Sequence, residues 1–154
     1  MRKLLLALLL AGCYDNFDIS KYKNGHEKRE RISELTDEYL PENESKLEEM
    51  GIVSIRYSSY EDCAEFAFKD HMPRKLMMGE YNRWQEIFPG YTKTEKPEKG
   101  DLAVYIDDEP KHFGIYAGKG KVISVYGNIP HIWRHELFDV PLSYGDEIKF
   151  YSYE

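Results

Sequence analysis

The N-terminal leader most constrains this chain, because it decides which residues are left to fold. After a basic start, Leu4 to Leu10 form an uninterrupted apolar run. A helix of that length spans only ~10 Å, far less than a bilayer. Ala11 and Gly12 are small residues that stand directly before Cys13, the pattern of a secretory cleavage site. We therefore expect residues 1–12 to be a signal peptide and the folded part to lie outside the cytoplasm.

The end of the leader, Leu10-Ala11-Gly12-Cys13, resembles the lipobox of bacterial lipoproteins. The resemblance implies that Cys13 becomes the first mature residue and carries fatty-acyl chains such as palmitate, which anchor it to the cell membrane or the outer membrane. The alternative is an ordinary signal peptide whose cleavage site precedes a cysteine. We expect residues 13–28 to be the lipidated cysteine and a tether, and residues 29–154 to form one domain with a single core.

The chain is acidic, with 21 Lys and Arg against 28 Asp and Glu and a net charge of −7 at pH 7. Loss of the leader's two basic residues makes the mature chain more acidic still. Nucleic-acid phosphates would be repelled, so no nucleic-acid partner is expected. Electrostatic adsorption to anionic lipid is excluded for the same reason, so membrane attachment has to be covalent.

Helical periodicity comes first along the chain, and short strands follow. Helices are expected between Glu27 and Leu40, around Leu47 up to Gly51, at 60–69 and at 81–87. Strands are expected at 52–57, 102–106, 112–117, 121–126 and 148–151, and around Ile132 and Val140, whereas 92–101 has the composition of an exposed loop. This order favours an α+β fold, with N-terminal helices packed on a small antiparallel β-sheet.

Cys63 lies on the most informative of these helices. Ser58 and Glu61 form a capping-box pattern, so Cys63 falls in or near the first helical turn. The positive end of a helix favours a thiolate, whereas the neighbouring Asp62 disfavours it. If Cys13 is acylated, Cys63 has no disulfide partner, because the chain contains two cysteines. An unpaired thiol in an exported protein is a candidate for reactivity.

His112 follows Cys63 along the chain and lies on an expected strand, a layout that suits a thiol hydrolase. In such a site the thiolate attacks a carbonyl, while an imidazole keeps the thiol ionised and later protonates the leaving amine. The backbone N–H of Cys63, free at a helix start, can donate to the oxyanion. Taken separately, Cys63 can also be core packing and His112 a structural histidine of the sheet.

Several motifs resemble the core of NlpC-type papain-like cysteine peptidases. They are Lys99-Gly100-Asp101-Leu102, His112-Phe113-Gly114-Ile115-Tyr116 and Gly118-Lys119-Gly120-Lys121-Val122-Ile123. Asp62-Cys63, on a helix that continues to Phe66, resembles the family's D-C-S-G-F nucleophile motif, although Ala64-Glu65 replaces its Ser-Gly. The resemblance covers residues 55 to 152. It implies a papain-like NlpC-type fold with Cys63 as nucleophile and His112 as general base and then general acid.

The family's third polar residue, which orients the imidazole, corresponds in position to Ser124. If Gly118-Lys119-Gly120 is a hairpin loop, Ser124 lies diagonally beside His112 on the same face of the sheet. His135 and Asn128, from the segment after Gly127, are alternatives for this role.

The expected function is that of an extracytoplasmic lipoprotein and cysteine peptidase or amidase. Family analogy points to cell-wall stem peptides, or peptidoglycan, as substrate. Two alternatives stay open: an inactive NlpC-like surface lipoprotein that binds a partner or wall fragment, and an acyltransferase that uses the same dyad. We expect no cofactor and no metal, because His131 and His135 follow Pro130 in a β context and lack an evident third ligand. The sequence carries no signal for an oligomeric state.

Overall fold

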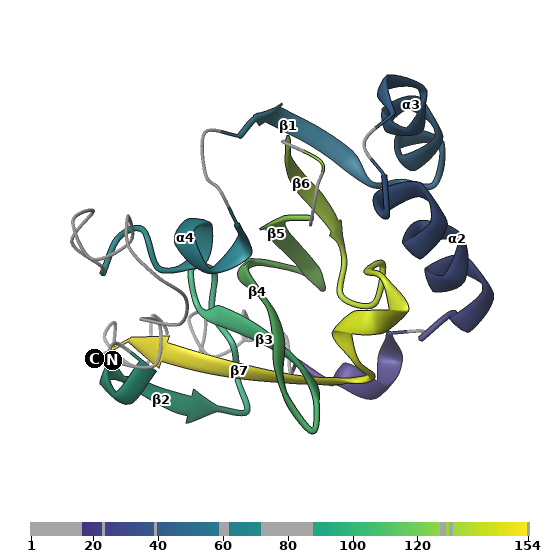
Figure 1. Cartoon of the computed structure of the whole chain (residues 1–154). Coiled ribbons are helices and arrows are strands. Elements are labelled where there is room, and N and C mark those ends of the chain that lie inside the picture. Colours follow the sequence, from purple (N-terminus) through teal and green to yellow (C-terminus); the bar gives the residue numbers. More distant parts are fainter. Residues whose placement is uncertain are drawn as a thin grey trace, which may run out of the picture.

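The chain is built around one curved seven-stranded sheet (Figure 1). This computed structural model describes residues 17–22, 24–38, 40–58, 62–71, 88–126, 129 and 131–153. The helical elements are η1 (Ile19–Lys21), α2 (His26–Thr36), α3 (Pro41–Glu49), α4 (Cys63–Ala67), η2 (Phe88–Gly90) and η3 (Leu142–Tyr144). The strands are β1 (Val53–Tyr57), β2 (Tyr91–Thr94), β3 (Leu102–Asp107), β4 (Glu109–Gly118), β5 (Lys121–Val125), β6 (His131–Glu136) and β7 (Glu147–Tyr153). They are ordered β1-β6-β5-β4-β3-β7-β2, and each neighbouring pair is antiparallel, so the α+β class is confirmed.

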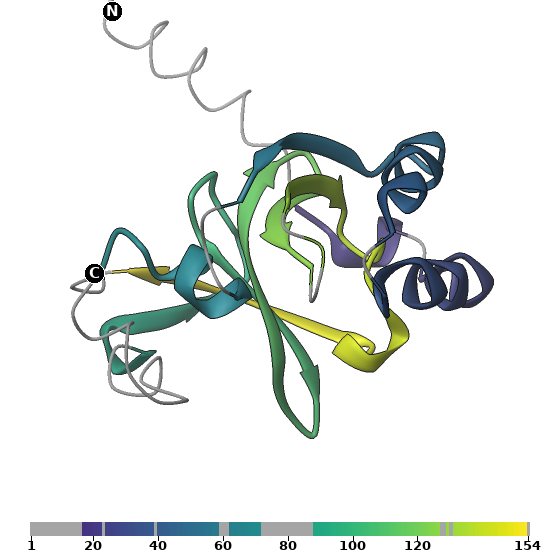
Figure 2. The ribbon, with the colours of Figure 1, turned by 45° about the horizontal axis from the view of Figure 1, so that its top comes forward.

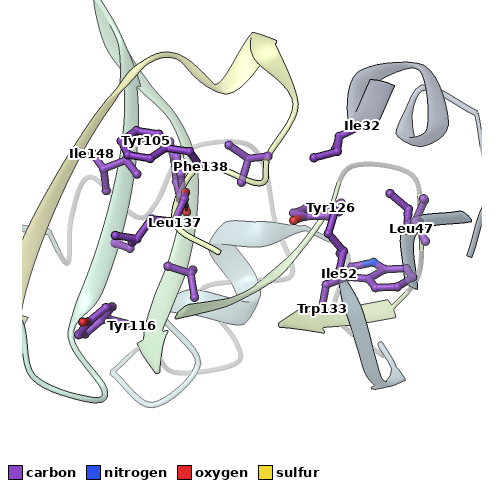
Figure 3. Packing of buried hydrophobic residues seen from close by; sticks show 14 of the residues in the cluster. Ile32, Leu47, Ile52, Tyr105, Tyr116, Tyr126, Trp133, Leu137, Phe138 and Ile148 are labelled. Atoms are coloured by element: carbon purple, nitrogen blue, oxygen red, sulfur yellow. Dashed lines mark hydrogen bonds between the residues drawn. The ribbon is translucent and has the colours of Figure 1, made fainter. Parts of the chain in front are cut away.

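Alternation along the strands gives the sheet two apolar faces, because successive side chains point to opposite sides. The larger face holds side chains such as Tyr105, Tyr126 and Trp133, each with 0% of its surface exposed (Figure 3). Each fully buried side chain of this size stabilises the fold by roughly 1.5–3 kcal/mol. The opposite face carries the side chains that alternate with them in sequence, including Val104 and Phe113.

Different helices cover the two faces. Ile32 and Leu35 of α2 and Leu47 of α3 pack into the larger cluster, and Tyr144 of η3 lies against it. On the other face, Phe66 of α4 packs against strands β5 and β6. Figures 1 and 2 show α4 on one side of the sheet and the α2–α3 pair on the other.

Several local predictions are wrong. The stretch predicted as a loop, 92–101, contains most of β2, which pairs with β7, a segment far away in sequence. Val140 is buried but lies between β6 and η3 rather than in a strand. Helix α4 begins at Cys63 and not at residue 60, because the Asp62 side chain caps it by accepting a hydrogen bond from the Glu65 N–H at 2.8 Å. The helix predicted at 81–87 falls outside the described residues.

The expected tether is partly incorporated into the domain. Phe17 contacts Tyr116 and Phe150 edge-on, at ring-centroid distances of 5.7 and 5.1 Å. Tyr22 lies over Gly120, where a Cβ atom would come within 1.9 Å of the tyrosine ring. The predicted boundary at residue 28 is therefore too late, because these aromatic rings bury their surface against the sheet.

The β4–β5 hairpin differs from the prediction in its loop and agrees with it in its register. Gly118 pairs with Lys121, so the loop is Lys119-Gly120, with φ values of 52° and 72°. Positive φ at both central positions is the geometry of a tight hairpin turn. A register shift between Tyr116 and Gly118 compensates for the shorter loop. The residues before it therefore keep the predicted alignment.

Candidate functional site

Cys63 is the first residue of α4 and is half-buried beneath it. Its side chain packs against the cluster that contains Val104 and Phe113. Burial raises the pKa of the Cys63 thiol to about 11, the backbone N–H of Phe113 offsets this only in part, and the negative charge of Asp62 raises the pKa further. At neutral pH only roughly one molecule in ten thousand carries the thiolate. This sulfur is a poor nucleophile as it stands.

His112 lies in β4 with 1% of its surface exposed. Its ring stacks on Tyr144 of η3, with the ring centroids 4.1 Å apart and the planes 10° from parallel. Tyr105 and Tyr126 flank it at centroid distances of 5.4 and 6.2 Å. Neither ring nitrogen has a hydrogen-bond partner in the described part of the chain. Burial, with a smaller effect of His135, lowers the pKa of His112 well below its usual value, so the ring is neutral.

Cys63 and His112 therefore occupy opposite faces of the sheet. Phe113 packs on the Cys63 side, and His112, the residue before it in the same strand, packs among the tyrosines of the other side. A sulfur within hydrogen-bonding reach of the imidazole would have been a partner for one of its nitrogens, and none is found among the described residues. The structure does not bring the predicted nucleophile and base together.

Ser124 shares the face of His112, as predicted, but its hydroxyl has a different partner. Its Oγ lies 2.8 Å from Nε2 of His135, and Nδ1 of His135 lies 2.7 Å from the carbonyl oxygen of Glu136. Because a carbonyl only accepts, Nδ1 donates, which makes Nε2 the acceptor for the Ser124 hydroxyl. The prediction that Ser124 orients His112 is therefore wrong. The alternative, His135, is excluded from that role too, because both of its nitrogens are already engaged.

His135 is buried like His112, and burial lowers its pKa to about 4. These two histidines, Ser124 and the surrounding tyrosines form a neutral polar group enclosed by the larger core. The other predicted site residues, Cys13 and Asn128, lie outside the described residues. The predicted lipidation therefore stays a prediction.

His131 has a structural role that sequence reasoning did not find. Its Nδ1 lies 2.8 Å from Ser54 Oγ of β1, and its Nε2 lies 2.9 Å from Glu44 Oε1 of α3. The imidazole thus connects β6 with the edge strand and with a helix. Among the described residues, no group of three or more metal-binding side chains is arranged to hold an ion.

The outer strand β1 carries the most conspicuous exposed apolar side chains. Val53, Ile55 and Tyr57 are 41%, 47% and 68% exposed, although they belong to a strand of the central sheet. The alternation of apolar and polar residues at 52–57 predicts a strand here. That the strand would lie at an edge depends on the sheet order, which the sequence does not reveal.

Comparisons with known proteins found no matching family model, no similar curated protein and no similar solved structure. No helix within the described ranges is both long enough and apolar enough to cross a bilayer.

Proposed function

We propose that this chain is a lipid-anchored, extracytoplasmic binding protein whose papain-like, NlpC-type domain does not hydrolyse peptide bonds. The observation that carries the proposal is the placement of Cys63 and His112 on opposite faces of β4. A general base has to reach the nucleophile's proton within hydrogen-bonding distance. Here a β-strand lies between the two groups, and the imidazole is enclosed by aromatic rings.

The NlpC-type interpretation rests on where the resembling motifs lie. Residues 112–116 are in β4, and the turn Lys119-Gly120, within the G-x-G motif, joins β4 to β5. Cys63 opens a helix that packs on this same sheet. A domain with this arrangement, whose imidazole is buried in the core, is suited to recognition rather than to acyl transfer.

The anchor rests on the leader. The basic start, the short apolar run and the small residues before Cys13 together predict cleavage and acylation there. An acidic chain without electrostatic attraction to anionic lipid needs such a covalent attachment to stay at a membrane.

A cysteine hydrolase acting on cell-wall peptides is the second candidate. It is favoured by the position of Cys63 at a helix start, where the backbone N–H groups of Phe113, Cys63 and Ala64 act to lower the thiol pKa. Such groups also stabilise an oxyanion. This candidate requires His112 to leave its aromatic enclosure, or another base to replace it. An acyltransferase that uses the same thiol has the same requirement.

Incubation of the full chain with purified peptidoglycan separates these functions. We expect no release of new amino groups above the level of Cys63→Ala, because the thiol is protonated and lacks a base. Release that disappears in both Cys63→Ala and His112→Ala, while His131→Ala retains it, would establish the hydrolase and overturn the proposal.

A further inference from the structure

The edge strand β1 is the surface of this molecule best suited to a partner. It is the outermost strand of the sheet (Figure 1), and among the described strands its neighbour is β6. The outer side of an edge strand presents backbone N–H and C=O groups that another extended chain can pair with. Val53, Ile55 and Tyr57 add exposed apolar surface along the same five-residue strand. Backbone pairing and apolar contact are thus available together.

A bulge in β1 places a cationic group beside this surface. Val53 pairs with Arg134 and Arg56 pairs with Ile132, with a register shift between Ser54 and Arg56. Ile132 packs against Phe66 and so lies on the α4 side of the sheet, and Arg134, two residues further along β6, lies on the same side. Because paired residues share a face, their partners Arg56 and Val53 also lie on the α4 side. Both arginines are exposed, and neither forms an ion pair within the described ranges.

The other side of β1 carries an aromatic ring that is held in place before any partner binds. The Tyr57 ring packs edge-on against His131, with centroids 5.6 Å apart. His131 is itself fixed by Ser54 of β1 and by Glu44 of α3. An exposed tyrosine whose ring is already oriented loses little conformational freedom on binding, which favours affinity.

The charges decide which kind of chain fits this edge. A second copy, paired through β1 by a two-fold axis, would bring two Arg56 side chains and two Arg134 side chains near one interface. A segment with carboxylates on alternate residues instead gives each guanidinium a partner that it can bind in a bidentate manner.

We propose that β1 binds an extended, acidic segment of a partner polypeptide, which adds to the sheet as a further strand. The segment's backbone pairs with the outer edge of β1, its carboxylates contact Arg56 and Arg134 on the α4 side, and its apolar side chains cover Tyr57 on the other side. This assignment rests on the proposed function, because it identifies the binding surface of a non-hydrolytic module.

The test uses the full chain in nonionic detergent and a fluorescent peptide of about eight residues with alternating Glu and Val. We expect saturable binding that weakens at least about tenfold in Arg56→Glu/Arg134→Glu, because each lost pair becomes a repulsion. Lys99→Glu is the control: it is an exposed charge reversal of the same sign in the loop between β2 and β3. It alters the overall charge of the protein but not the β1 surface, so the affinity should stay within about twofold. On binding, the backbone amides of β1 should gain protection from hydrogen exchange.

A peptide with alternate backbone amides N-methylated cannot pair as a strand and should not bind. The proposal is overturned if this peptide or a Lys–Val peptide binds equally well, if both arginine reversals leave affinity unchanged, or if no binding occurs. It is also overturned if sedimentation shows a dimer that Tyr57→Ser dissociates, because a second copy then occupies the edge. Hydrolysis of peptidoglycan is measured separately at Cys63, so failure of either proposal leaves the other measurable.

Discussion

At the scale of single residues, His112 is the most informative side chain, because it is buried without compensation. A buried polar group that lacks hydrogen bonds costs folding free energy. Both nitrogens of His112 are in this position, and the surrounding rings of Tyr105, Tyr126 and Tyr144 suit an aromatic hydrocarbon equally well. The residue is therefore tolerated by the fold rather than required by it.

His112→Phe should raise the free energy of unfolding at pH 7 by about 1 to 2 kcal/mol, because it removes two unsatisfied nitrogens and keeps the ring stack on Tyr144. Urea denaturation followed by circular dichroism measures this. Ser124→Ala provides the contrast, since it deprives His135 of its partner at 2.8 Å and should destabilise. A loss of stability in His112→Phe would mean that the imidazole has a partner and that the description of its enclosure is wrong.

At the scale of elements, Arg29 joins α2 to the segment before β7. Its guanidinium is fully buried and donates to the carbonyl oxygens of Val140, Pro141 and Gly145 and to the carboxylate of Asp146. Without the guanidinium, the buried carbonyl oxygens of Val140 and Gly145 would lose this donor, whereas the largely exposed Asp146 carboxylate would keep its contact with Asn24. The contacts also hold η3, and with it Tyr144, against His112.

Arg29→Met should destabilise the protein by about 2 to 4 kcal/mol, because each buried carbonyl oxygen that loses its donor costs about 1 to 3 kcal/mol. Arg31→Met is the matched control: Arg31 lies on the same helix, but its pair with Glu34 is exposed, and such pairs contribute at most about 1 kcal/mol. Chemical denaturation of both variants measures the difference. Equal effects would show that the network around Arg29 does not hold the segment.

The sequence predicted those elements whose signals are local. Strands β3, β4 and β5 follow from apolar alternation and from the glycines of their hairpin. The sequence did not predict strand β2, because its polar residues pair with β7, and no local pattern reveals a contact between segments so far apart in sequence. The predicted capping box failed for another local reason: Asp62 lies closer to the helix start and caps it.

The candidate site was predicted less well than the fold, because it depends on which face of a strand meets which helix. Alternation could have given a warning: Phe113 and Ile115 form the apolar row that an amphipathic helix would cover, and His112 lies out of phase with them. The order of the motifs along the chain does not reveal on which face of the strand the His112 side chain lies. The choice of face depends on tertiary packing.

At the scale of the whole molecule, the two buried histidines make stability depend on pH. Burial lowers the pKa of His135 to about 4 and that of His112 well below its usual value, so the unfolded chain binds protons more readily than the folded one. The stability that the neutral histidines contribute is therefore fully present above the pKa of about 6.5 that they have in the unfolded chain. It is lost as the pH falls toward their lower pKa values in the folded protein. Asp139, whose pKa is raised by burial, acts in the opposite sense.

Between pH 7 and pH 5 we expect a loss of about 2 kcal/mol from His135 alone, with a further loss from His112. Urea denaturation at several pH values measures this, and His112→Phe should show a smaller loss than the unaltered chain. Stability that is constant over this range would contradict the burial of both rings as neutral groups.

Cys63 and His112 lie on opposite faces of β4 and should therefore ionise independently, which the pH dependence of Cys63 alkylation measures. The rate of reaction with iodoacetamide is followed from about pH 6 to pH 10, with Cys63→Ser as the blank for Cys13. We predict a slow reaction that accelerates up to the highest pH, with the same profile in His112→Phe, because the thiol pKa is about 11 and owes nothing to the imidazole. A plateau already reached near neutral pH, and abolished in His112→Phe, would contradict the account.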